Sequence, residues 1–317
     1  HWMGEMNKAA AVMLLEQNII SAALGKSIAV AVARVMADGA LPGAARPGNY
    51  MVLEKLLVKA GGAEITRVHS GRSRQDMLAT SHRLFLRDQW LDTFDSLARL
   101  RASMLDLAGT HPHDLIPAYT HNVQAQPTSF GHYLMAFTAA LQRLAERMRE
   151  SWVRLNRSPL GSGALGTSSF PIDRPRLAQL LGFDGAVENS YDANHVAPCD
   201  LGVEVAGIAA SGALTGEAFI NDLLAQYRQT RPWIVLREGG LTGPSTIMPQ
   251  KRNPIVLVAA RHQASNVVAQ AQACLMVAHN IGTGLLEHRG NEALFALQST
   301  AGFFDTLAAA TAALTLD

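Results

Sequence analysis

The chain has 317 residues, of which 48% are hydrophobic and 17% charged, and its formal net charge is +1. The hydrophobic content allows a sizeable core, and the low charge density points to large buried subunit interfaces. A near-zero net charge without a basic block argues against nucleic acid and anionic membranes as partners.

The first 70 residues predict short helices that break at Gly39–Gly43 and at Gly61-Gly62. We therefore place a small N-terminal helical domain at residues 1–73 and a helix-bundle domain at residues 74–317. Cys199 and Cys274 stand in no metal or disulfide spacing, which fits a reducing cytoplasm.

Long helices are predicted for the rest of the chain. From Phe130 to Leu155, apolar residues recur at steps of three and four over some seven turns. Four more helices are predicted at about Met77–Leu107, Asp200–Tyr227, Pro254–Asn280 and Glu292–Leu314. Because no strand with alternating apolar residues is evident, the predicted fold class is all-α, an elongated central helix bundle with a small N-terminal helical domain. Scattered Gln, Asn and His in the uncharged stretch Gln263–Leu286 favour a buried helix over a membrane span.

The segment Gly243–Pro254 combines a glycine, three prolines, a serine and a lysine, which predicts a loop. Asn253-Pro254 predicts an N-cap followed by the first residue of a helix. Ser245 is a potential base or nucleophile, and Lys251 is a positive charge beside a helix N-terminus, where a carboxylate can bind. An ordinary connector with a cap is the alternative interpretation.

Two segments carry further polar groups. His69–Asp76 holds two arginines and two serines before a long helix, a set suited to carboxylates, although a charged first turn paired with neighbouring acids also fits it. Tyr119–Pro127 is predicted to be a loop in which His121 can transfer a proton near neutral pH.

Two other segments are interpreted more plainly. His111–Asp114 has no companion ligand pattern, so we expect no metal there. Pro159–Thr167 is rich in glycine, but it follows a helix rather than a strand and lacks the lysine of a phosphate-binding loop. We therefore do not interpret it as a nucleotide-binding segment.

Taken in chain order, four of these segments resemble the fumarase/aspartase superfamily and, within it, argininosuccinate lyase. Ser245–Pro254 resembles the superfamily signature of Ser, Met-Pro, Lys and Asn-Pro. The segments at His69–Asp76, Thr120–Pro127 and Pro159–Ala164 resemble the lyase specifically, and the resemblance extends from about Asn7 to about Leu316. It implies a homotetramer with a core of twenty helices, active sites that gather segments of three subunits, and no metal or organic cofactor.

The resemblance also implies a reaction, the anti β-elimination of an N-substituted aspartate to fumarate and an amine. Ser245 is the implied base, His121 the implied acid for the leaving nitrogen, and Lys251 with Asn253 the implied carboxylate holders. Further substrate contacts are implied at six positions, Asn7, Ser73, Arg74, Gln75, Thr120 and Gln126.

Some positions depart from the family pattern. Val258 stands where the family has a glutamate paired with the histidine, and Gln75 replaces an asparagine. Leu286–Phe295 lacks the run that contacts the arginine end of the substrate and offers only Glu287 or Glu292 as acids. We therefore expect an amine other than arginine. The chain ends soon after the fifth helix, so we expect the family's usual C-terminal helical domain to be missing from it.

Two alternatives stay open. The first is a carboxymuconate cycloisomerase-like activity, because that branch also has no glutamate after the segment that corresponds to Lys251–Pro254. Against it, His69–Arg74 resembles the argininosuccinate branch. A non-catalytic, crystallin-like structural relative would share the fold, but the presence of four residues argues against it, namely Ser245, Lys251, Asn253 and His121.

Overall fold

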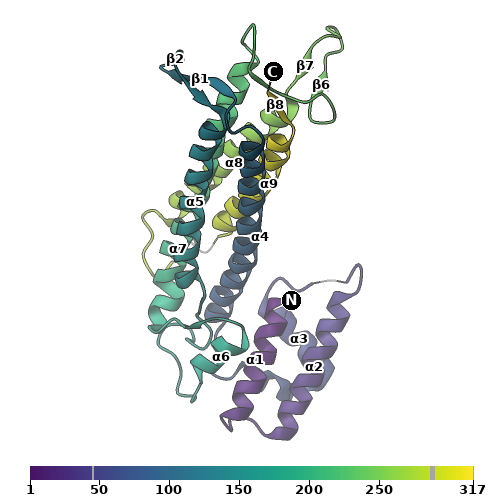
Figure 1. The fold of residues 1–317 in the computed structure, drawn as a ribbon. Coiled ribbons are helices and arrows are strands. Elements are labelled where there is room, and N and C mark those ends of the chain that lie inside the picture. The colour runs from purple at the N-terminus through teal and green to yellow at the C-terminus, as the bar shows by residue number, and fades with distance from the viewer. Residues whose placement is uncertain (45, 286–289, 317) are drawn as a thin grey trace. The chain divides into compact units, whose positions relative to one another are not determined.

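The computed structural model describes residues 1–44, 46–285 and 290–316, and most of them are helical, which confirms the all-α class (Figure 1). The chain divides into two compact units. Unit 1 contains residues 1–87, 153–201 and 281–289, and unit 2 contains residues 88–152, 202–280 and 290–317. The predicted N-terminal domain at residues 1–73 lies within unit 1, which also includes later segments of the chain.

Unit 1 is built mainly from short helices. Its elements are α1 (Trp2–Glu16), α2 (Ala22–Ala40), α3 (Tyr50–Gly61), the 3₁₀ helix η1 (Ala63–His69), α6 (Arg174–Leu180), the π-helical turn η2 (Asp192–Val196) and the parallel pair β3 (Arg157–Ser158) and β4 (Gly185–Ala186). Ser21 caps α2 by accepting from Leu24 N, and Asn49 caps α3 by accepting from Val52 N. Gly62 ends α3 with φ 86°, which explains the predicted break.

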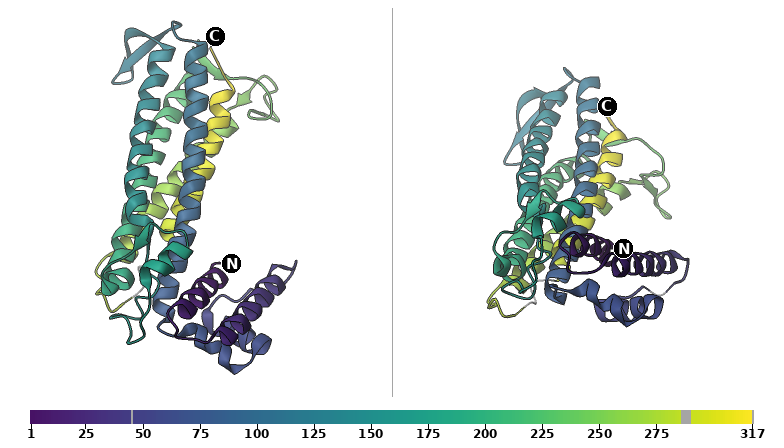
Figure 2. Two further views of the ribbon diagram at one scale, coloured as in Figure 1. Left: turned by 60° about the horizontal axis from the view of Figure 1, so that its bottom comes forward. Right: turned by 90° about the horizontal axis from the view of Figure 1, so that it is seen from below.

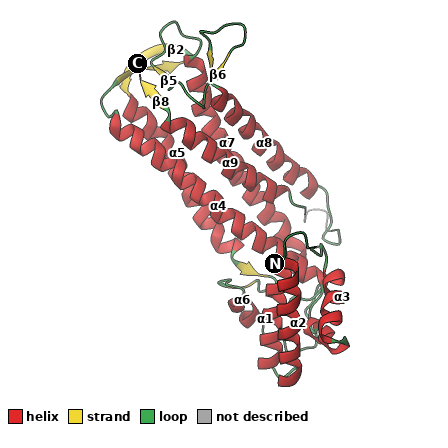
Figure 3. Cartoon of the chain, turned by 90° about the vertical axis from the view of Figure 1, so that its right-hand side faces the viewer, coloured by secondary structure: helices red, strands yellow, loops and turns green. Residues whose placement is uncertain are grey.

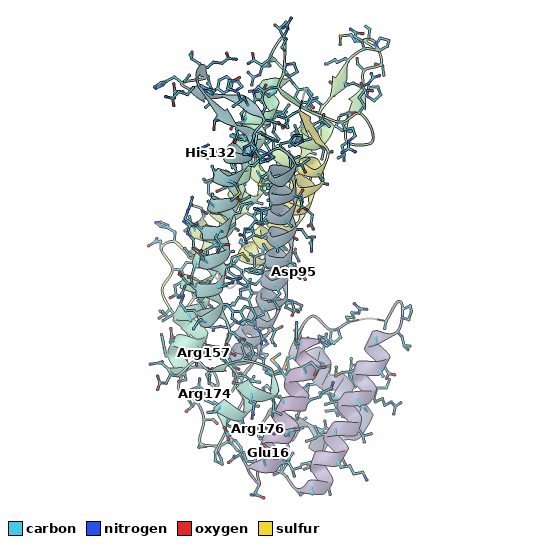
Figure 4. The ribbon with its side chains drawn as sticks, in the orientation of Figure 1. Glu16, Asp95, His132, Arg157, Arg174 and Arg176 are labelled. Carbon is cyan, nitrogen blue, oxygen red and sulfur yellow. The ribbon has the colours of Figure 1, made fainter. Side chains whose placement is uncertain are left out.

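The core of unit 1 joins the N-terminal helices to α6. Met6, Ile28, Leu57 and Leu177 are all fully buried in one apolar cluster. On the surface, Arg176 of α6 pairs with Glu16 of α1 at 2.9 Å. Figure 4 labels both residues. Exposed pairs of this kind contribute little to stability, so the apolar cluster holds α6 in place.

Unit 2 is a bundle of long helices (Figure 2). They are α4 (Arg74–Thr110), which begins in unit 1, α5 (Phe130–Leu155), α7 (Ala197–Gln226), α8 (Ile255–Ala278) and α9 (Glu292–Ala312). All five predicted long helices are confirmed to within a few residues. Within unit 2 they lie side by side, as Figure 3 shows.

Small residues let these helices approach closely. A Cβ added at Gly216 of α7 would lie 2.5 Å from Phe303 Cζ of α9, and one at Gly212 would lie 2.8 Å from Phe304 Cζ. Both phenylalanines are fully buried. Thr93 of α4 also donates a hydrogen bond to Leu297 O of α9 at 3.2 Å. The two glycines therefore leave the space that the aromatic rings of α9 fill.

Three antiparallel pairs of strands, which the sequence analysis missed, lie in unit 2. They are β1 (Leu115–Thr120) with β2 (Val123–Ser129), β5 (Ile234–Leu236) with β8 (Leu314–Leu316), and β6 (Gly243–Pro244) with β7 (Arg252–Asn253). In the first pair Pro117 lies opposite Pro127, and most side chains of β2 are exposed. Paired prolines and exposed side chains hide a strand from pattern analysis, so the predicted loop at Tyr119–Pro127 is wrong.

One continuous helix in the part of the chain described, Asp192–Gln226, is long and apolar enough to span a membrane by composition alone. Its most apolar window has a mean hydropathy of 1.3, and 44% of that window is buried. A core helix of a bundle meets the same criteria, and this helix packs in the bundle through Gly212 and Gly216.

Candidate functional site

Ser245 lies on the loop between β6 and β7 in unit 2. Its Oγ accepts a hydrogen bond from Met248 N at 3.2 Å, which fixes the first turn of the loop. Lys251 is exposed near the end of the same loop, and its backbone N–H donates to Met248 O at 2.9 Å. The loop therefore presents a half-buried hydroxyl and a solvated ammonium in one compact segment.

Asn253 closes this loop rather than capping the following helix. Its Nδ2 donates to Gly243 O at 3.1 Å and contacts Pro244 O at 3.5 Å. Helix α8 begins at Ile255, Pro254 occupies the cap position, and no side chain caps the helix. The predicted N-cap is therefore wrong, because the amide of Asn253 instead joins the two strands of the β6–β7 pair.

His121 and Thr120 lie at the tip of the β1–β2 hairpin. His121 and Asn122 have φ values of 51° and 62°, which form a two-residue loop of the type I′ kind between Thr120 and Val123. Thr120, His121 and Gln126 are all exposed. The tight turn thus holds the imidazole out into solvent.

Both hairpins project from the same end of the unit 2 bundle (Figure 1). Among the described residues, no hydrogen bond or ion pair joins the His121 hairpin to the Ser245 loop, and His121 has no acidic partner. Val258, which replaces the family's glutamate, is 50% exposed on α8. The structure thus brings Ser245, Lys251 and Asn253 together and places His121 on a separate element.

The substrate residues predicted near the start of α4 belong to unit 1, where Asp76 organises them. The Asp76 side chain is fully buried and accepts from Ser73 N at 2.9 Å, Gly161 N at 2.9 Å and Gly163 N at 3.1 Å. Burial raises the pKa of Asp76 to about 6, although these N–H groups and the charge of Arg72 oppose the shift. The carboxylate thereby fastens the glycine-rich loop to the first turn of α4.

Asn7 is fully buried in α1, and its Oδ1 accepts from Arg72 Nη2 at 2.9 Å. Arg72 also donates to Val68 O at 2.7 Å and to Met6 O at 3.5 Å. The buried guanidinium thus ties η1 to α1. Asn7 therefore holds Arg72. Its side chain has no exposed surface with which to make the predicted substrate contact.

His69 lies next to this guanidinium and stacks on Tyr50, with ring centroids 4.4 Å apart. Burial and the charge of Arg72 lower the pKa of His69 to about 4. The imidazole is therefore neutral at physiological pH and acts as an aromatic packing group between η1 and α3.

Of the predicted substrate contacts in unit 1, Arg74 is exposed and Ser73 and Gln75 are half-buried. Sequence reasoning did not assign Asp76 a role, although Ser73 and Asp76 have the spacing of a capping box, which could have revealed it. It also missed His195, which lies in η2 and contacts two backbone carbonyl groups. A histidine inside a helical stretch carries no sequence signal for such contacts.

The segment 286–295, from which we expect an amine other than arginine, is only partly described by the structure. Residues 286–289, and with them Glu287, lie outside the described residues. Glu292 lies in the first turn of α9 and is half-buried.

A separate cavity of about 700 Å³ lies among the N-terminal helices of unit 1, and its lining includes Met36, Leu53 and Lys59. It includes none of the predicted site residues. Among the described residues, no group of three or more His, Cys, Asp or Glu side chains is arranged to hold a metal ion.

Comparisons with known proteins bear on this arrangement. The sequence model of the lyase family matches residues 16–269. Argininosuccinate lyase of Geobacillus sp. (strain WCH70) is 36% identical over 265 residues, which cover 84% of this chain and 56% of that protein. The chain therefore spans little more than half the length of this curated relative.

Solved structures agree with the family match. The crystal structure of EDDS lyase in complex with formate is 28% identical, with a TM-score of 0.90 over 99% of this chain and 62% of that one. A β-carboxy-cis,cis-muconate cycloisomerase from Acinetobacter calcoaceticus is 19% identical, with a TM-score of 0.78 over 100% of this chain and 73% of that one, a likeness of fold alone. The chain therefore belongs to the lyase family of the fumarase/aspartase superfamily and resembles argininosuccinate lyase within it.

Proposed function

We propose that the chain is a carbon–nitrogen lyase that converts an N-substituted aspartate to fumarate and an amine by anti β-elimination. The observation that carries this proposal is the β6–β7 loop, where Ser245 and Lys251 are held in one segment closed by Asn253. The similarity to argininosuccinate lyases supports the reaction class.

In the proposed reaction, deprotonated Ser245 takes the proton from Cβ of the succinyl group. The C–H electron pair forms the C=C bond of fumarate, the Cα–N bond breaks, and its electron pair leaves with nitrogen. A proton delivered to nitrogen completes the amine, and His121 is the proposed donor. Serine is a weak base, so a positive environment such as that of Lys251 must favour its ionised form.

The carboxylate next to Cβ gains charge as the proton leaves, and donors near it lower the barrier. A single well-placed donor of this kind is typically worth ~3–4 kcal/mol. Lys251 can supply one such group. The Asn253 amide can supply a second, since Gly243 O takes one of its N–H groups at 3.1 Å and the 3.5 Å contact to Pro244 O is weak.

We propose a homotetramer whose sites combine segments of three subunits. The separation of the His121 hairpin from the Ser245 loop supports this, because no hydrogen bond or ion pair among the described residues joins these two elements within one chain. Apolar side chains exposed on the helices of unit 2 also support buried subunit contacts. They include Leu91, Met135, Leu214, Val258, Leu275 and Met276, which are 48–71% exposed. A cytoplasmic location fits the two free cysteines.

We also propose that the amine is not arginine, because the family's run of arginine contacts is absent from the sequence 286–295. The test is to incubate the purified protein with fumarate and a panel of amines while following fumarate absorbance. Loss of fumarate with at least one amine, and its release from the matching succinyl-amine, is expected. If arginine ranks first, the substrate proposal fails.

The Ser245→Ala variant tests the mechanism. It should lower kcat by roughly a hundredfold or more while the oligomer, measured by light scattering, stays unchanged. Substantial residual activity would remove Ser245 from the base role. A protein that is inactive with every amine would instead favour a cycloisomerase-like or crystallin-like relative, and turnover of a carboxymuconate lactone would separate these two.

A further inference from the structure

The π-helical turn η2 places His195 between two loops of unit 1. The His195 Nδ1 atom lies 2.8 Å from Thr283 O, and its Nε2 atom lies 3.1 Å from Ala164 O. The side chain is 7% exposed. Carbonyl oxygens only accept hydrogen bonds, so a neutral ring bonds one of these loops at a time and a doubly protonated ring bonds both.

Neighbouring side chains of the same region reinforce both contacts. Asn194 Nδ2 donates to Gly163 O at 2.8 Å and to Ala164 O at 3.1 Å. The Tyr191 hydroxyl lies 2.8 Å from Thr283 Oγ1. Asn194 therefore holds loop 161–164 and Tyr191 holds segment 281–285, and His195 adds a bond to one of them when its ring is neutral and to both when it is doubly protonated. π-helical turns of this kind occur frequently at functional sites.

The loop that His195 holds also leads to the predicted substrate residues. Gly161 N and Gly163 N donate to Asp76 Oδ2, and Asp76 Oδ1 accepts from Ser73 N, directly before Arg74. A continuous chain of hydrogen bonds thus runs from Thr283 through η2 and the glycine-rich loop to the first turn of α4. All of these groups belong to unit 1.

We propose that Tyr191 and His195 are positioning residues for substrate binding. They fix segment 281–285 and loop 161–164, and the loop in turn fixes the turn that presents Arg74. This inference rests on the proposed lyase function and extends it to residues that do not contact the reacting atoms. Their loss should weaken binding of the succinyl-amine while leaving the chemical step largely intact.

The test uses Tyr191→Phe, which removes only a hydroxyl, and His195→Gln, which keeps a polar side chain of similar length. Matched controls are Tyr227→Phe, whose hydroxyl bonds Leu236 N elsewhere, and His113→Gln at an exposed position. Hydrogen–deuterium exchange should become faster at residues 281–285 in Tyr191→Phe, faster at residues 161–164 and 281–285 in His195→Gln, and unchanged in the controls.

Steady-state kinetics with the best succinyl-amine supply the second measurement. We expect KM to rise about 3- to 10-fold per variant, the scale of one lost hydrogen bond, with kcat within about 2-fold of wild type. Unchanged exchange in both test variants overturns the inference, as does faster exchange with unchanged KM or an equal effect in the controls. If wild type turns over no succinyl-amine, the proposed function has failed, and exchange alone decides whether η2 positions these loops.

Discussion

Asp76 gives a pH-dependent contribution to stability whose size follows from its burial. Its pKa rises from 3.8 to about 6 in the folded chain. A shift of about 2 units corresponds to ~3 kcal/mol. Because the folded form binds the proton more tightly than the unfolded form, this stabilisation is fully present below about pH 4 and is lost as pH rises through about 6.

The Asp76→Asn variant removes this titration. Between about pH 4 and pH 7, the free energy of unfolding of wild type should fall by ~2–3 kcal/mol relative to the variant. The absolute offset between the two proteins also includes lost bonds to Gly161 and Gly163, so the slope of the difference against pH is the informative quantity. Urea unfolding at half-unit steps of pH measures it.

Asp95→Asn is the matched control, since it removes an exposed carboxylate from the same helix (Figure 4). Taking differences from wild type cancels the titration of every other group that the substitution does not disturb. The reasoning is refuted if the difference between wild type and Asp76→Asn stays flat within about 0.5 kcal/mol, or if it grows as pH rises.

Three further substitutions probe neighbouring groups. His69→Gln should show the opposite slope: the pKa of His69 is lowered from 6.5 to about 4, so wild type gains stability over the variant as pH rises through this range. Asn7→Ala should lower the free energy of unfolding by ~1–3 kcal/mol, measured in urea, because Arg72 loses a buried acceptor. Asn253→Ala should lower kcat roughly tenfold or more without unfolding the protein, because the loop loses its bond to Gly243 O.

Each of these has a distinct contrary result. A slope of the same sign for the His69 and Asp76 variants would mean that burial does not control both groups. An Asn7 variant as stable as wild type would mean that water replaces its contact with Arg72. An Asn253 variant with normal kcat would show that the β6–β7 pair holds Ser245 without this amide.

Local sequence patterns were sufficient to specify the long helices and the main helix breaks. Apolar residues at helical spacing from Phe130 to Leu155 specify a buried stripe, and the glycine pair at 61–62 specifies a helix end. The order of motifs around Arg74, His121 and Ser245 was sufficient to identify the family. The helix and break signals are local, because each depends on residues within a few turns of one another, whereas the family is identified by the order of short motifs along the chain.

The contacts that the site residues make depend on long-range packing. Asn253 has the sequence of a cap and closes a loop, and Asn7 holds a buried arginine 65 positions away. His195 reaches carbonyl groups 31 and 88 positions distant along the chain. Hydrogen bonds between residues so far apart depend on how the helices pack, and the spacing of residues along the chain carries no record of that packing.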